Sequence, residues 1–552
     1  MVHLPFRYPR LLLAGLLVSA LSPASAKFDA AEVYTESPGV AAHFPVPKEV
    51  SFTTPAFAKG KKDFTSQREM ENFIREMAAS SPTLKVRVVA QSQEGRAIPL
   101  LIFTREGYDS PQWLAKNGKP TVLIVAQQHG NEPAGGEAAL MFAKSLADGK
   151  EGDVLSRVNV LIIPRANPDG AEHFTRDLAN GVNLNRDHLL LASPEGRAIA
   201  QVLNSYLPDV TLDAHEFSVA GRWVKKFDAV QGYDGLVQHA TTLNLSRPLY
   251  QAMAGAWNTA LSQAFKAHGL RDSVYYTTDQ IHLEDKTLSM GGTGPDALRN
   301  MAGLRNSIAF LLETRGVGIG KAHFERRVWT QFVAMQAMVK QAALDSQALM
   351  TLTRDVRSEV AASAGKGELM VKGKATRGKH EVTLLNARTG APMTFEADWR
   401  SSLQIAAEIV RSRPWGYLLA PEQQAAVDKL RELGVEVYRL KQSRAIPVER
   451  YMVASLEQGE KFDVTGKVGA TGNKMTKVTT TLVKTELTGT AGYWYVPLSQ
   501  PLANLIVAAL EPETQSSFVA NGVITLPAAS EKAASLPLWR VTENISTLPD
   551  LF

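Results

Sequence analysis

The stretch TVLIVAQQHGNEPAGGE (residues 121–137) joins a strand-like segment to a helix-like one. Residues 121–126 are continuously rather than alternately apolar, which is typical of a strand buried on both faces of a sheet. His129 and Glu132 stand three residues apart in the turn that follows. Two interpretations fit this turn: an ordinary polar helix start, or two ligands of a metal site.

Three further runs have the same continuous character, and helix-period segments separate them. They are VNVLIIP (158–164), DVTLDA (209–214) and SIAFLLE (307–313). Buried strands that alternate with helices predict an α/β domain with a largely parallel or mixed sheet. The polar residues of interest lie at or just beyond the C-terminal ends of these runs, where open α/β sheets bind their ligands.

Local signals predict further elements around this domain. Ser66 to Glu69 has the form of a capping box and predicts a helix through about residue 79, and a hairpin is expected around Gly95. Residues 324–362 contain neither glycine nor proline, so one long helix or two shorter ones should close the domain.

The composition changes beyond residue 363. Residues 364–379 (AGKGELMVKGKATRGK) are interpreted as a linker and the start of a new unit. A helix is expected at 421–433 and strands after residue 450. The sequence thus predicts four parts: a signal peptide (1–26), a catalytic domain (27–363), a small α/β region (364–450) and a β-rich region (451–552).

The first 26 residues have the pattern of a secretory signal peptide. Two arginines precede an apolar stretch that ends in Ala24-Ser25-Ala26, a small-x-small cleavage site. The apolar stretch is shorter than the roughly 20 residues of a spanning helix. We therefore expect export to the periplasm or the medium, without stable membrane insertion.

Charge and cysteine content narrow the possible functions. Removal of the first 26 residues takes away two arginines and no acid, so the formal net charge falls from +5 to +3. No basic stripe is present, which argues against nucleic acid as a partner. The chain has no cysteine, so any metal must be held by histidine and carboxylate side chains.

Four segments carry the candidate catalytic residues: HGNE with His129 and Glu132, TRDLANGVNLNRD (175–187) with Arg176, Asn183, Asn185 and Arg186, DAHE with His215, and LLETRG with Glu313. Two histidines and one carboxylate suit catalytic zinc, which takes three protein ligands and keeps one position for water. A further carboxylate can accept a proton, and arginines can hold a carboxylate or a developing oxyanion. Each segment alone has an ordinary structural interpretation, but their joint order favours a hydrolytic zinc site.

In this combination the sequence resembles the zinc carboxypeptidases of the funnelin type, the M14 metallopeptidases. The resemblance runs from about Phe52 to Gly316 and includes SQEGRAIPLLIF, HGNE, NPDG, NLNRD, DAHE and LLETRG. It implies a three-layer α/β/α sandwich on a mixed, mostly parallel eight-stranded sheet, with one zinc ion as cofactor.

The resemblance also implies a role for each matched residue: zinc ligands for His129, Glu132 and His215, general base for Glu313, polarisation of the scissile carbonyl for Arg176, and a grip on the substrate's terminal carboxylate for Asn185 and Arg186. The implied activity is that of a zinc metallocarboxypeptidase acting on peptides with a free C-terminal carboxylate.

Two departures from the family pattern affect the site. Asn183 stands where many members have an aspartate that braces the first zinc histidine. A neutral amide raises the basicity of that histidine less than a carboxylate would. The stretch SMGGTGPDALRN (289–300) lacks the tyrosine that closes over the substrate in digestive members; the nearest are Tyr275 and Tyr276. Its Asp296 and Arg299 are either substrate-facing groups or solvated loop charges.

Two other functions fit part of the pattern. A zinc-dependent deacylase of N-acyl amino acids, similar to aspartoacylase, shares the H-x-x-E and N-R elements, but the signal peptide and the LLETRG context favour the carboxypeptidase. A non-catalytic binding protein on a peptidase fold should lack a ligand or the base, and neither is missing here.

Overall fold

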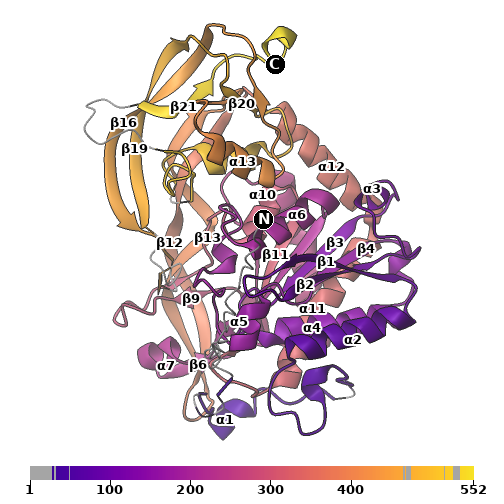
Figure 1. Ribbon diagram of the computed structural model, residues 1–552. Coiled ribbons are helices and arrows are strands. Elements are labelled where there is room, and N and C mark those ends of the chain that lie inside the picture. Colours follow the sequence, from indigo (N-terminus) through magenta and orange to yellow (C-terminus); the bar gives the residue numbers. More distant parts are fainter. Residues whose placement is uncertain are drawn as a thin grey trace, which may run out of the picture.

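An eight-stranded sheet forms the centre of the N-terminal part of the chain in the computed structural model (Figure 1). Its strands, in spatial order, are β1 (Leu84–Gln91), β2 (Ala97–Phe103), β4 (Asn159–Ile163), β3 (Thr121–Ala126), β5 (Val210–Ser218), β11 (Ile308–Val317), β7 (Gly235–His239) and β8 (Asp272–Val274). The structure describes residues 28–552 except 30, 32, 49, 464–465, 468–473, 515 and 526–534, so the expected signal peptide lies outside the described residues.

Parallel pairing joins β4, β3, β5 and β11 in the middle of the sheet, and also joins β7 to β8. Antiparallel pairing joins β1 to β2, β2 to β4 and β11 to β7. The sheet is therefore mixed and mostly parallel, as predicted. The hairpin expected around Gly95 is the β1–β2 pair.

Helices cover both faces of this sheet, which makes the predicted three-layer α/β/α arrangement. Figure 1 shows α2 (Gln67–Ser80), α4 (Pro133–Ala147) and α11 (Phe324–Leu344) on one side, and α6 (Pro194–Tyr206) and α10 (Leu298–Leu304) on the other. The predicted capping box begins α2: Glu69 N donates to Ser66 Oγ at 3.3 Å, and Ser66 N donates to Glu69 Oε2 at 2.8 Å. The segment 324–362 forms two helices, α11 and α12 (Ser346–Ala362).

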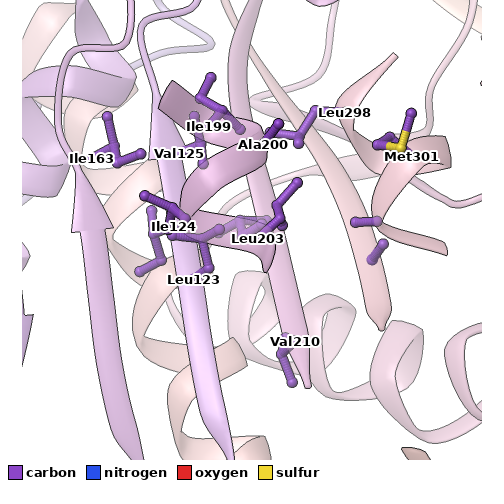
Figure 2. Packing of buried hydrophobic residues seen from close by; sticks show 14 of the residues in the cluster. Leu123, Ile124, Val125, Ile163, Ile199, Ala200, Leu203, Val210, Leu298 and Met301 are labelled. Atoms are coloured by element: carbon purple, nitrogen blue, oxygen red, sulfur yellow. The ribbon is translucent and has the colours of Figure 1, made fainter. Parts of the chain in front are cut away.

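The central strands are apolar throughout because both of their faces are covered. Leu123, Ile124 and Val125 of β3 are all fully buried, although successive side chains of a strand point to opposite faces. Figure 2 shows this strand beside α6, whose Ile199 and Leu203 belong to the same buried cluster. Full burial of a Leu, Ile or Val side chain contributes roughly 1.5–3 kcal/mol, so this packing holds β3 between the two helical layers.

A long antiparallel hairpin follows the helices. It consists of β12 (Glu368–Asn386) and β13 (Pro392–Ser412), and it forms a five-stranded sheet with β6 (Ala229–Gln231), β10 (Leu288–Ser289) and β9 (Thr277–Thr278). The segment 364–379, interpreted as a linker and the start of a new unit, has only its first four residues outside regular structure, because β12 begins at Glu368. Gly373 reflects close packing rather than flexibility, since a Cβ there would lie 2.6 Å from Cγ2 of Ile405.

The remaining residues build a six-stranded sheet in the order β15 (Tyr438–Arg439), β20 (Trp494–Pro497), β14 (Gly416–Leu419), β21 (Ser535–Val541), β16 (Ile446–Glu460) and β19 (Lys474–Leu487). The helix expected at 421–433 is α13 (Gln424–Glu432), and α14 (Ala503–Leu510) follows β20. The expected boundary at residue 450 falls inside β16, and the four-part division of the chain stays a prediction.

The β16–β19 hairpin extends from this upper sheet toward β12 and β13 (Figure 1). It thereby brings C-terminal residues close to the edge of the catalytic part where the candidate site lies. No helix among the described residues is both long enough and apolar enough to cross a bilayer.

Candidate metal centre and active site

His129, Glu132 and His215 come together at the C-terminal edge of the eight-stranded sheet. His129 and Glu132 lie in the turn between β3 and α4, and His215 lies on β5, the parallel neighbour of β3. Ala126 at the end of β3 pairs with Ala214, so the turn begins beside His215. Parallel strands end at the same edge, and this is why the three side chains converge.

The spacing of the three side chains fits a zinc ion. His129 Nδ1 lies 2.8 Å from Glu132 Oε1, His215 Nδ1 lies 2.9 Å from Glu132 Oε2, and the two Nδ1 atoms are 3.1 Å apart. Two ligands of a tetrahedral zinc ion stand about 3.3 Å apart. In the part of the chain that the structure describes, this is the one group of His, Asp and Glu side chains arranged to hold a metal.

A second polar group orients each histidine ring. Asn183 Oδ1 lies 3.0 Å from His129 Nε2 and also accepts the Asn185 backbone N–H at 2.9 Å. Asp213 Oδ1 lies 2.7 Å from His215 Nε2. Since an amide oxygen and a carboxylate accept hydrogen bonds, both Nε2 atoms carry the hydrogen and both Nδ1 atoms are left to bind a metal.

Sequence reasoning singled out Asn183 as the partner of His129 but missed Asp213. The signal was present in DAHE, because Asp213 precedes His215 by two residues on one strand. Alternate residues of a strand share a face, so the two side chains were bound to be neighbours.

The expected base and the expected arginine both reach this cluster. Glu313 on β11 is the register partner of His215 on β5. Burial and the negative charge of Glu132 together raise the pKa of Glu313 to about 8. Arg176 Nη1 donates to Glu132 Oε1 at 2.9 Å and lies 3.2 Å from His129 Nδ1.

Two cavities meet at this point. The larger has a volume of about 840 Å³ and the smaller about 400 Å³. Arg176, Tyr275 and Glu313 line both of them. Of the two nearest tyrosines in the sequence, Tyr275 therefore faces the site at its centre, whereas the hydroxyl of buried Tyr276 donates to Gln231 Oε1 at 3.0 Å.

Residues 70–244 match the family model of the zinc carboxypeptidases. This segment is a zinc carboxypeptidase domain. It contains all the expected site residues except Glu313, and the match confirms zinc as the cofactor and metallocarboxypeptidase as the class of enzyme.

Individual proteins show similarity over different shares of the chain. Carboxypeptidase 2 of Trichophyton equinum is 28% identical over 553 residues, which cover 97% of this chain and 99% of the relative. Carboxypeptidase E of Caenorhabditis elegans is 31% identical over 144 residues, covering 22% and 29%. A metallo-carboxypeptidase structure from Burkholderia cenocepacia is 19% identical, covers 51% of this chain and 70% of its own, and has a TM-score of 0.38.

The zinc carboxypeptidase domain places Asn185 and Arg186 differently. The Asn185 amide is committed to the protein: Nδ2 donates to Asp213 Oδ2 at 3.2 Å and contacts His215 Nε2, and Oδ1 accepts the Leu298 backbone N–H at 2.8 Å. Arg186 lines the larger cavity and donates from Nη1 to the Asn185 carbonyl at 2.6 Å. Of the two, Arg186 is the side chain whose charge faces the cavity.

The larger cavity also contains residues from the C-terminal part of the chain. Lys461, which follows β16, lies 2.5 Å from Oδ2 of Asp296, and both side chains are buried. Burial opposes ionisation of Asp296, but Lys461 and Arg186 hold its pKa below the ordinary value. The interpretation of Asp296 and Arg299 as solvated loop charges is therefore wrong, because both are buried and line the cavity.

Proposed function

We propose that this metallocarboxypeptidase hydrolyses the C-terminal peptide bond of peptides that carry a free α-carboxylate. The observation that carries the proposal is the position of Arg176 and Glu313 at the junction of the two cavities, beside the His129–Glu132–His215 cluster. A peptide that spans both cavities has one bond next to these groups.

Each side chain then has a defined task. When bound, zinc acts as a Lewis acid and lowers the pKa of water to about 7. Glu313 accepts the proton of the attacking water and passes it to the leaving amine. Arg176 donates hydrogen bonds to the carbonyl oxygen as negative charge develops on it.

The cavities set the direction of the peptide. Arg186 lines only the larger cavity, and a guanidinium is the preferred partner of a carboxylate. The residue to be released therefore occupies the larger cavity, with its α-carboxylate on Arg186. Asn185 acts as a positioning residue, since its amide holds Asp213 and the backbone of Leu298.

Matched substrates test this proposal. The zinc-loaded protein is offered peptides with free C-termini, the same peptides with amidated C-termini, and N-acyl amino acids. We expect turnover of the free peptides and loss of turnover on amidation. Turnover of the acyl amino acids alone would identify a deacylase instead.

We further propose that the protein is exported. The proposal rests on the Arg7–Ala26 pattern in the sequence, which predicts cleavage before Lys27. N-terminal sequencing of protein recovered from the periplasm and from the medium of an expressing culture tests it. Full-length chain retained in the cytoplasm would contradict it.

A further inference from the structure

Arg299, at the start of α10, is a buried cation without an acidic partner. Arg299 is only 5% exposed. Nη2 donates to the Gly292 carbonyl at 2.7 Å, and Nε has no hydrogen-bond partner. Among the residues that the structure describes, no carboxylate forms an ion pair with this guanidinium.

The local chain is built to keep this guanidinium in place. A Cβ on Gly291 would lie 2.6 Å from Arg299 Nη2, so a larger residue there would displace the guanidinium from its present position. Asn300 Nδ2 donates to the carbonyls of Gly292 at 3.0 Å and Gly294 at 2.9 Å, which holds the same loop. Arg299 and Asn300 thus both donate to the Gly292 carbonyl, which ties the guanidinium to this loop.

Of the acidic groups around Arg299, Glu313 forms no ion pair with it, and the other two are paired with other residues. Asp296 pairs with Lys461, and Asp213 pairs with His215. Burial and the positive charge of Arg186 together lower the pKa of Arg299 to about 10. The guanidinium is therefore still charged at neutral pH, and it costs free energy to keep it buried without a counter-charge.

Arg305 shows that burial of an arginine without an ion pair does not by itself indicate a substrate-binding group. It too is buried without an acidic partner, but it donates to Asn204 Oδ1 at 2.6 Å and to the Leu433 carbonyl at 2.8 Å, and it lines neither cavity. Arg299 lines the larger cavity together with Arg186 and Glu313. Arg299 therefore lacks a counter-charge in the cavity that, under the proposed function, receives the residue to be released.

We propose that Arg299 binds a second carboxylate of the substrate, in the side chain of the C-terminal residue, so that the enzyme preferentially releases glutamate or aspartate. This inference rests on the proposed function. Arg186 takes the α-carboxylate and Arg299 the side-chain carboxylate, and each charge-assisted contact discriminates against a neutral analogue of the same shape.

The test compares peptides that differ only in the last residue: Glu, Gln, Leu and Lys. For the zinc-loaded wild type we expect kcat/KM for the Glu peptide to exceed that for the Gln peptide by about 10- to 100-fold. Arg299→Met should remove most of this ratio, mainly through KM for the Glu peptide, and Arg299→Lys should retain part of it. Zinc content and thermal midpoint are measured for each variant.

Arg400→Met is the matched control. Arg400 lines the same cavity, but its side chain is 40% exposed and it faces Asp285 at 3.7 Å. We expect this variant to keep the wild-type ratio of Glu to Gln. Inhibition by free L-glutamate, set against L-glutamine, gives a second readout on wild type that does not require either variant to fold.

The outcomes separate the two proposals. If wild type cleaves none of the peptides, the proposed function fails. If the kcat/KM of wild type for the Gln, Leu or Lys peptide equals or exceeds that for the Glu peptide, only the inference about Arg299 is overturned. An equal loss on all four peptides in Arg299→Met also overturns it, because Arg299 would then hold the α-carboxylate.

Discussion

Nδ1 of His129 lies 3.1 Å from Nδ1 of His215, and the hydrogen of each ring sits on the opposite nitrogen, facing Asn183 and Asp213. Two nitrogen lone pairs at this distance repel one another unless a cation lies between them. The pairing therefore favours a cation between the two rings, and its consequences can be measured.

Replacement of His129 by alanine should remove the metal. The remaining Glu132 and His215 provide two of the three ligands, and catalytic zinc requires three. We expect less than stoichiometric zinc in the purified variant by elemental analysis. His173→Ala serves as control, since His173 pairs with Glu94 away from the cluster and should leave zinc content unchanged. Full zinc occupancy in His129→Ala would rule out the assigned ligand set.

The Asn183 amide should matter for zinc affinity. Asn183→Leu leaves His129 Nε2 without its acceptor, and loss of such an outer partner typically weakens metal binding about 10- to 100-fold. Asn183→Asp should bind zinc at least as tightly as wild type, because a carboxylate raises the basicity of the ring. Competition with a chromophoric chelator measures all three proteins. Identical affinities would show that Asn183 does not brace the histidine.

Glu313→Gln should separate metal binding from catalysis. Glu313 is not among the three ligands, so zinc content should equal that of wild type. Glutamine cannot accept the proton of the attacking water, and we expect kcat to fall by about 10²- to 10⁴-fold. Single-turnover and steady-state assays on a free-C-terminus peptide measure this. A variant with near-normal kcat would require another base.

Arg186→Ala should impair substrate binding more than chemistry. Removal of a carboxylate partner takes away an interaction made in both the ground state and the transition state, so KM should rise by about 10- to 100-fold while kcat changes little. Arg105→Ala, which removes an exposed arginine that pairs with Asp153, should leave both constants unchanged. An unaltered KM in Arg186→Ala would contradict the carboxylate-binding role.

Glu36 should make stability depend on pH. Burial raises its pKa, but hydrogen bonds from His323 and Arg315 prevail and lower it to about 2. A pKa depressed in the folded state stabilises above the unfolded value of about 4.5, and that stabilisation is lost as pH falls toward 2. At neutral pH it amounts to roughly 3 kcal/mol.

Glu36→Gln should therefore lower the free energy of unfolding at pH 7, and the difference from wild type should shrink below about pH 4.5. Denaturant unfolding between pH 3 and pH 8 follows the two proteins. Glu106→Gln is the control, because the Glu106 side chain, which pairs with Lys119, is 38% exposed. A difference that stays constant over this range would mean that the Glu36 charge is not responsible.

Much of the site could be predicted because its residues sit at the ends of strands with a strong local signal. The run 121–126 is apolar at every position except its first, and the structure has β3 at those residues. Where the linker ends within 364–379 could not be predicted, because glycine and lysine have the same local preference in a linker and in a half-exposed strand. Pairing with β13, a contact distant in sequence, makes this segment a strand.

By itself the sequence determined the α/β class, the zinc ligands expected at His129, Glu132 and His215, and the carboxypeptidase class, because strand burial and short ligand motifs are local patterns. Only the tertiary structure decided that Asp213 braces His215, that Lys461 reaches Asp296 from the C-terminal part, and that buried Arg299 forms no ion pair with a carboxylate of the described residues. These features depend on which side chains meet across distant strands and on how much water the packing excludes. Neither the contacts between distant strands nor the degree of burial can be read from the order of the residues.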